Sequence, residues 1–285
     1  MKARVLILLA CSVAVLRAAS PNTAALTLFK AKHYPESREA FEQIAAAEPD
    51  NAEAHYYLGM IALRRSDNDE AIRQLELATH LAPTNSDYFA DLGDAYSRAI
   101  DKAGLLSQMG LARKCQTALE KSVELNPDNL PARNGLVSFY RQAPTFVGGG
   151  LSKAYEQAAE IKRRDPVMGA AVYGQLYISE KKFDEAFAVF ERLLTTHPDN
   201  YLALYSIGRT AAQTGTRLDR GEQALRRCLE LTPGKGEPGH AAAQWRLGVI
   251  AEKRGDRAAA RSAYEEALKL DPAFAQARES LVKLK

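Results

Sequence analysis

The sequence is poor in the residues that build disulfide-linked or metal-bound domains. It contains 3 cysteines and 5 histidines in 285 residues, and three cysteines are too few for a disulfide scaffold. The histidines form no H-E-x-x-H motif and no cysteines are closely paired, so we predict no metal site and no other cofactor. No Ser-His-Asp or Cys-His arrangement emerges from the spacing, and we predict that the protein is not an enzyme.

An excess of charge of one sign is also missing. The chain has 38 Lys and Arg against 35 Asp and Glu, a formal net charge of +3. Lys2, Arg4 and Arg17 lie in the first 19 residues, which contain no acid, so a mature chain without them balances. A neutral chain lacks the general attraction that binds nucleic acids or anionic lipids. We therefore predict no nucleic-acid partner.

Long hydrophobic runs are confined to the N-terminus. Residues 5–16 are almost wholly apolar, follow the basic Lys2 and Arg4, and precede the small Ala18 and Ala19. This is the three-part pattern of a secretory signal peptide, and the run is shorter than the ~20 residues that span a bilayer. We predict a signal peptide over residues 1–19, no integral membrane span, and an exported protein, either periplasmic or secreted.

Two alternatives remain open at this end of the chain. Leu8-Leu9-Ala10-Cys11 resembles a bacterial lipobox, and Cys11 would then carry a lipid anchor to the cell envelope. The segment could also stay uncleaved. Arg17 is a poor residue three positions before a cut after Ala19, so the cleavage site is open.

Regularly spaced prolines organise the rest of the chain. Several are followed by Asp-Asn or a close variant, as in Pro49-Asp50-Asn51. Proline cannot continue a helix, and Asp or Asn caps the next one. Each proline thus marks a helix end followed by a helix start. The set is Pro49, Pro83, Pro127, Pro166, Pro198, Pro233 and Pro272.

Alignment on these prolines brings small and large residues into register. A large residue followed by glycine recurs at Leu58-Gly59, Leu92-Gly93, Tyr173-Gly174, Ile207-Gly208 and Leu247-Gly248. Twelve residues before each proline lies a small residue, and eight before it a residue that is large in all repeats but one. We expect the small residue of the first helix to face that of the second, with large residues beside the contact. The small residues that lie twelve positions before the prolines are Ser37, Ala71, Cys115, Ala154, Ala186, Gly221 and Ala260.

This pattern resembles the tetratricopeptide repeat (TPR), a helix-turn-helix unit of 34 residues. The resemblance implies an all-α, right-handed solenoid of about seven helix pairs over residues 21–285. Residues 275–285, with Phe274, Ala277, Leu281 and Leu284 on one side, are expected to form the C-terminal capping helix. The expected repeats are 21–51, 52–85, 86–129, 130–166, 167–200, 201–240 and 241–274.

Three segments depart from the repeat. The third repeat carries extra residues around 100–110, and the fourth is interrupted at 143–150, where we expect an exposed turn tipped by Phe146 or, alternatively, a contact made by that ring. Gly234, Gly236 and Gly239 match G-x-G-x-x-G but follow a helix, so we interpret them as a connector. His55, Cys115 and Cys228 fall on packing positions and are expected to be buried.

The resemblance also implies a ligand face on the concave side, formed by the first helices. Two groups stand out: an acidic spot at Asp87, Asp91 and Asp94, and an aromatic and guanidinium group near the C-terminus. The alternative is a solvated face with aromatic packing between repeats. The candidate binding residues are Tyr56, Tyr57, Asp91, Asp94, Asn134, Arg141, Tyr205, Arg209, Trp245 and Arg246.

These features together favour a non-catalytic scaffold that binds a protein or peptide in its groove. Export suggests a setting in the assembly or organisation of the cell envelope. Two alternatives are a regulatory or accessory subunit of an envelope enzyme complex, and a self-associating structural repeat protein. The Lys/Asn set with which some TPR proteins hold a partner's C-terminal carboxylate is missing from the expected positions.

Overall fold

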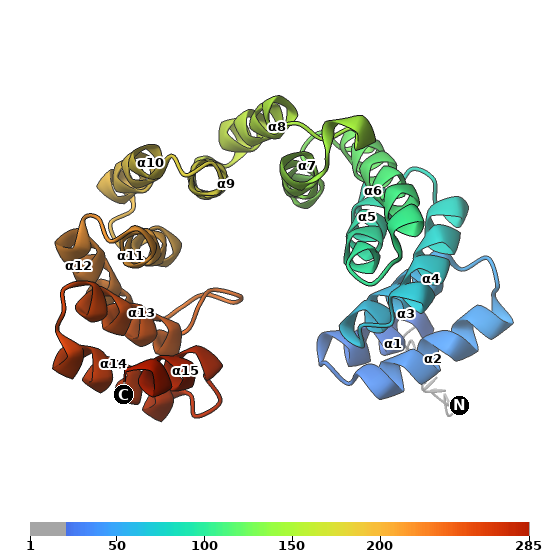
Figure 1. Cartoon of the computed structure of the whole chain (residues 1–285). Helices are drawn as coiled ribbons and strands as arrows, with labels where there is room; N and C mark the ends of the chain where they lie inside the picture. The colour runs from blue at the N-terminus through green and yellow to red at the C-terminus, as the bar shows by residue number, and fades with distance from the viewer. Residues whose placement is uncertain (1–20, 285) are drawn as a thin grey trace, which may run out of the picture. The chain divides into compact units, whose positions relative to one another are not determined.

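The computed structural model describes residues 21–284, without the side chains of residues 105 and 106. Every regular element in this range is helical (Figure 1). No helix in this range is both long and apolar enough to cross a bilayer. The predicted signal peptide and the lipid attachment at Cys11 lie outside the described residues.

The chain divides into two compact units, Met1–Asn126 (unit 1) and Pro127–Lys285 (unit 2), which we describe separately. The helices of unit 1 are α1 (Pro21–Lys30), α2 (Tyr34–Ala47), α3 (Ala52–Arg64), α4 (Asn68–Leu81), α5 (Ser86–Ile100) and α6 (Leu105–Leu125). Unit 2 holds α7 (Leu130–Gln142), the 3₁₀ turn η1 (Thr145–Val147), α8 (Leu151–Arg164), α9 (Pro166–Ser179), α10 (Phe183–Thr196), α11 (Tyr201–Thr214), α12 (Leu218–Glu230), α13 (His240–Lys253), α14 (Arg257–Leu270) and α15 (Ala275–Lys283).

The residues that follow the prolines start the helices by capping. The Asn51 side chain accepts a hydrogen bond from the Ala54 amide at 3.0 Å, and Asn200 accepts one from Ala203 at 2.9 Å. Such caps satisfy amides that have no partner within the helix, and each contributes about 1 kcal/mol. A helix ends two or three residues before each of these prolines, which confirms the helix ends, but after Pro233 the next helix begins only at His240. The same cap is made by Asp67, Asn85, Asn129, Asp165 and Asp256.

Within each unit the helices pack as pairs, and the pairs pack on one another. In unit 1, α3 packs on α4 and α5 on α6, while α4 also contacts α5. In unit 2 the same order joins α7 to α8, α11 to α12 and α13 to α14, and α15 packs on α14. Ala277 and Leu284 are buried in that last contact, which confirms the predicted capping helix. The predicted all-α array of helix pairs is therefore confirmed.

The close contact inside each pair involves both a small and a large residue of the second helix. The predicted approach of small residues is present, because a Cβ on Gly221 would lie 3.7 Å from Gly208, and one on Gly93 would lie 3.6 Å from the Cys115 carbonyl oxygen. The large residue reaches across the interface to the same glycine, as a Cβ on Gly208 would lie 2.2 Å from Leu225 and one on Gly93 would lie 2.6 Å from Leu119. The other pairs of this kind are Gly59–Leu75, Gly174–Phe190 and Gly248–Tyr264.

The two irregular segments take different forms. The extra residues of the third repeat lengthen α6 to 21 residues after a short turn at 101–104. The segment 143–150 is an exposed turn, as expected: Phe146 is 72% exposed, while Val147 is buried. Gly148 adopts a φ of +99°, a left-handed conformation that favours glycine.

The predicted buried polar and sulfur groups are confirmed. Cys115 and Cys228 are free and buried, and burial raises the pKa of each thiol to about 12, so neither is a reactive thiolate. The His55 ring is buried between two partners, with Nδ1 2.7 Å from the Gln74 side-chain oxygen and Nε2 2.9 Å from the Pro49 carbonyl. These residues serve packing rather than chemistry.

Candidate binding faces on the first helices

The first helices of the repeats carry all ten candidate binding residues. In unit 2 these helices (α7, α9, α11 and α13) lie on the inner side of the unit, with α8, α10, α12 and α14 outside them (Figure 1). Helix α11 packs directly on α13, and α3 on α5 in unit 1. Adjacent first helices therefore present their side chains on a common face within each unit.

On the face of unit 1, Tyr56 and Asp91 form a bonded pair between α3 and α5. The Tyr56 hydroxyl donates to Asp91 Oδ2 at 2.7 Å, and the Tyr56 ring stacks on Tyr88 with a centroid distance of 4.3 Å. Burial raises the pKa of Asp91, and the neighbouring Asp94 and Asp87 raise it further against the lowering effect of the Tyr56 bond. This face therefore combines a stacked aromatic surface with a partly desolvated carboxylate.

The other two candidates of unit 1 have structural partners. Tyr57 stacks on Phe41 with centroids 5.0 Å apart and also contacts Phe29, so its ring belongs to the core between α1, α2 and α3. Asp94 is exposed and forms an ion pair with Arg98 at 2.8 Å. For these two residues the structure shows the packing and surface-charge roles that the sequence left open as alternatives.

The face of unit 2 brings together Arg209 and Arg246, which we call the arginine pair. Arg209 Nη2 donates to the Gln175 side-chain oxygen on α9 at 2.9 Å. The Arg246 guanidinium lies over the Trp245 ring, 4.1 Å from its centroid. The Nε atoms of both arginines are buried and have no hydrogen-bond partner within residues 21–284. Burial lowers the pKa of Arg209, and the charge of Arg246 lowers it further, against the raising effect of Tyr205.

Tyr205 and Trp245 both make contacts that hold the structure together. Tyr205 is only 7% exposed and lies in the core of α10, α11 and α12. Trp245 Nε1 donates to Ser280 Oγ on α15 at 3.0 Å, and the ring meets Phe274 edge to face. Trp245 therefore helps to hold the capping helix while it supports Arg246.

Asn134 and Arg141 stand apart from the arginine pair. Both lie on α7, where Asn134 is exposed and Arg141 is half-buried. Helices α8, α9 and α10 separate them along the chain from α11. Tyr88 is missing from the binding residues predicted from the sequence. The sequence indicates it only through its position, since Tyr56 and Tyr88 both lie near the starts of consecutive first helices.

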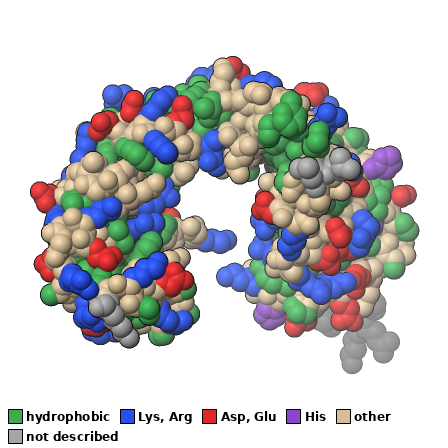
Figure 2. All heavy atoms as spheres, viewed as in Figure 1, with side chains coloured by type: hydrophobic (Ala, Val, Ile, Leu, Met, Phe, Trp, Pro, Cys, Tyr) green, Lys and Arg blue, Asp and Glu red, His purple; other side chains and the backbone are tan. Residues whose placement is uncertain are grey.

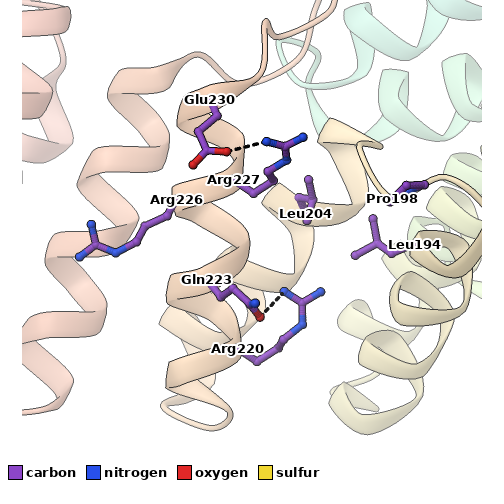
Figure 3. Close-up of a pocket in the computed structure, with 8 residues that line it drawn as sticks. All are labelled: Leu194, Pro198, Leu204, Arg220, Gln223, Arg226, Arg227 and Glu230. Atoms are coloured by element: carbon purple, nitrogen blue, oxygen red, sulfur yellow. Dashed lines mark hydrogen bonds and ion pairs between the residues drawn. The ribbon is translucent and has the colours of Figure 1, made fainter.

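A surface pocket of about 470 Å³ lies on the outer side of unit 2 between α10 and α12 (Figure 3). Its arginines are all neutralised: Arg220 pairs with Glu191 at 2.7 Å, Arg226 with Glu222 at 2.7 Å, and Arg227 with Asp199 at 2.8 Å. The pocket offers no unsatisfied charge to a ligand. Its lining residues are Leu194, Pro198, Leu204, Arg220, Gln223, Arg226, Arg227 and Glu230.

The two units also differ in net charge. Residues 21–126 contain 11 Lys and Arg against 16 Asp and Glu, whereas residues 127–285 contain 24 against 19. The formal charges are thus −5 and +5, which the neutral total conceals. Figure 2 shows Lys and Arg side chains on the inner side of unit 2, and mixed charges over its outer helices.

Comparison with known proteins gives the family. Two tetratricopeptide repeat family models match the chain, one at residues 22–86 and 172–236 and the other at 241–274. The structure resembles that of a tetratricopeptide repeat protein from Parabacteroides merdae, with a TM-score of 0.66 and 16% identity, over 93% of this chain and 96% of that one.

Two curated relatives share shorter segments with the chain. The Protein CTR9 homolog of Arabidopsis thaliana is 30% identical over 42% of this chain, and Cellulose synthase operon protein C of Pseudomonas fluorescens is 28% identical over 48%. The aligned segments span only 10% and 11% of those longer proteins. Because the family models cover more than half of the sequence and the helix pairs have the corresponding packing, the chain belongs to the tetratricopeptide repeat family.

Proposed function

We propose that this protein is an exported, non-catalytic scaffold that binds an extended segment of a partner protein on the inner faces of its first helices. The observation that carries the proposal is the contrast within unit 2. The arginines that line the outer pocket are paired with carboxylates, whereas the inner Arg209 and Arg246 keep buried Nε–H groups without a partner in residues 21–284. Aromatic and arginine side chains of this kind dominate the energy of protein interfaces.

The face of unit 1 supports the same proposal with a different chemistry. Tyr56 and Tyr88 present stacked rings, and Asp87 lies exposed beside them on α5. A stacked aromatic surface buries apolar groups, and neighbouring carboxylates attract basic ones. We expect this face to prefer basic or aromatic segments, whereas the face of unit 2 prefers acidic ones.

Export and an envelope setting rest on the sequence of residues 1–19. The apolar run with basic residues before it supports a cleaved signal peptide, and Cys11 supports the lipid-anchored alternative. The name of the Pseudomonas relative links that protein to a cellulose synthase operon. This favours, as a second candidate, an accessory subunit whose partner belongs to an envelope enzyme complex.

The test is affinity capture from the native envelope fraction with the mature full-length chain as bait. We expect one or more proteins to bind the wild type and to be lost with the double variant Arg209→Gln/Arg246→Gln. The matched control is Arg192→Gln/Arg261→Gln, which removes the same charge from exposed positions on α10 and α14. Equal recovery by all three baits would contradict the proposed face. N-terminal sequencing of the exported product would show whether cleavage occurs before Cys11 or near Ala19.

A further inference from the structure

Arg209 and Arg246 differ from the other arginines of unit 2 in the burial of an unpartnered donor. Eight of the 15 arginines of this unit lie within ion-pair distance of a carboxylate, and the other seven make no ion pair within residues 21–284. Among those seven, only Arg209 and Arg246 have a buried Nε without a hydrogen-bond partner in that range. Surface arginines paired with a carboxylate contribute little to stability and offer little to a ligand. The paired set is Arg133, Arg163, Arg164, Arg217, Arg220, Arg226, Arg227 and Arg254.

Two contacts hold the arginine pair in place. The Gln175 side-chain oxygen accepts a hydrogen bond from Arg209 Nη2 at 2.9 Å. The Arg246 guanidinium stacks over the Trp245 ring, 4.1 Å from the ring centroid. Neither contact uses the Nε–H groups, which are buried without an acceptor. A buried donor without a partner is destabilising, and two nearby cations repel each other. An anion that accepts from both arginines would relieve both costs.

We propose that the arginine pair binds a carboxylate of the partner polypeptide, an Asp or Glu side chain or a C-terminus, between α11 and α13. This inference rests on the proposed function and adds the chemical class of the ligand. A guanidinium presents a planar fork of donors that matches a carboxylate in two-point contact. The buried Nε–H of each arginine is one arm of such a fork.

Nucleic acid fits this site less well than peptide does. Nucleic-acid surfaces present many unpaired basic groups along a stripe, because each phosphate needs its own counter-charge. Eight of the other 13 arginines of unit 2 are engaged by carboxylates, as the ion pairs of Arg220 and Arg227 illustrate. A site of two arginines beside an indole suits one carboxylate on an otherwise uncharged segment.

The experiment is selection from a random displayed peptide library against the mature full-length chain. We expect the selected peptides to be enriched in Asp, Glu or a free C-terminus at one fixed position. One selected peptide is then titrated against the protein by the fluorescence of Trp245, the only tryptophan of the chain. Replacing its acid by the amide, or amidating its C-terminus, identifies which carboxylate binds and should weaken binding about tenfold or more.

The protein variants give the reciprocal test. Arg209→Gln/Arg246→Gln should lose the same tenfold or more, Arg209→Lys/Arg246→Lys should recover part of it, and the control Arg192→Gln/Arg261→Gln should bind like the wild type. If the arginine variants unfold, the peptide amides on the wild type still decide the question.

Three results would overturn the inference. Selected peptides without an acidic bias, or with a bias that persists in the glutamine variant, would remove the carboxylate site and leave the peptide-binding scaffold intact. Selection of no peptide at all would overturn the proposed function together with this inference. Preferential binding of a single-stranded RNA oligonucleotide at the same arginines would assign the site to phosphate instead.

Discussion

The inner faces of the two units treat a buried charge in opposite ways. In unit 1 the desolvated Asp91 carboxylate accepts a hydrogen bond from the Tyr56 hydroxyl at 2.7 Å, which compensates part of the cost of burying its charge. In unit 2 the Arg209 and Arg246 guanidinium groups keep buried donors that nothing in the described chain satisfies. A compensated buried charge contributes to the structure, whereas an uncompensated one marks a place where a ligand improves the energy.

The scaffold beneath the faces is the same in both units. Gly93 lies against Leu119 in unit 1 and Gly208 against Leu225 in unit 2, each across the interface of a helix pair. The difference between the units therefore lies in the side chains of the first helices and not in how the pairs are packed. The predictions below test the shared scaffold first and then the contrast between the faces.

The largest effect is expected from filling the glycine positions. Gly93→Ala and Gly208→Ala each place a Cβ within 2.6 Å of a leucine, and both should lower the free energy of unfolding by about 1–3 kcal/mol. Gly110→Ala is the control, because this glycine of α6 has open space around its Cβ position and should gain up to about 1 kcal/mol. Urea unfolding followed by circular dichroism measures the stability of all three variants. A loss of stability in only one of Gly93→Ala and Gly208→Ala would contradict the conclusion that the two units share the same helix packing.

A loss of stability in the same range is expected from Tyr56→Phe. The substitution removes the hydroxyl that donates to Asp91 and leaves a partly buried carboxylate without that partner, which costs about 1–3 kcal/mol. The pKa of Asp91 should rise further, because the lost bond lowers it in the wild type. NMR titration of the side-chain carboxyl measures this rise, and an unchanged pKa would mean that the pair does not compensate the charge.

Trp245→Phe should cost about 1 kcal/mol, the typical net value of one hydrogen bond. The phenyl ring keeps a face for Phe274 but cannot donate to Ser280 on α15. Hydrogen exchange should accelerate in residues 275–284 and stay unchanged in unit 1. Faster exchange throughout the chain would show that Trp245 supports more than the capping helix.

The smallest effect concerns pH and Asp91. A carboxyl whose pKa is raised in the folded state stabilises the fold while it is protonated, below its unfolded pKa of about 3.9. That contribution is lost as the pH rises through the folded pKa. Asp91→Asn should therefore flatten this decline of stability with rising pH and be neutral or slightly stabilising at pH 7. A steeper decline of stability with rising pH in the variant than in the wild type would contradict this prediction.

Much of the scaffold follows from sequence because its signals are local. Proline ends a helix through its own ring. The Asn51 or Asn200 side chain caps the helix that follows it by accepting from the backbone amide three residues further on, so these boundaries can be predicted without a structure. The pairing of glycine with a large residue depends on which way a leucine or aromatic side chain turns across the interface. The register alone placed the small residues of the two helices near each other, which the structure confirms for Gly208 and Gly221, but it did not indicate that a large side chain also covers the glycine.

The candidate faces were predicted less completely. Repeat positions placed Tyr56, Asp91, Arg209 and Arg246 on first helices, but the same rule included Tyr57, which packs partly buried against the core, and Tyr205, which is buried. Whether a side chain is satisfied by a neighbour depends on contacts between helices more than 30 residues apart, such as Arg209 with Gln175. Sequence spacing does not encode those contacts.

The most direct test of the central claim is to map a selected peptide on the full-length chain by hydrogen exchange. The account predicts slower exchange in α11 and α13 for an acidic peptide, with the effect abolished in Arg209→Gln/Arg246→Gln. Protection confined to α10 and α12, around the outer pocket of Figure 3, would contradict it.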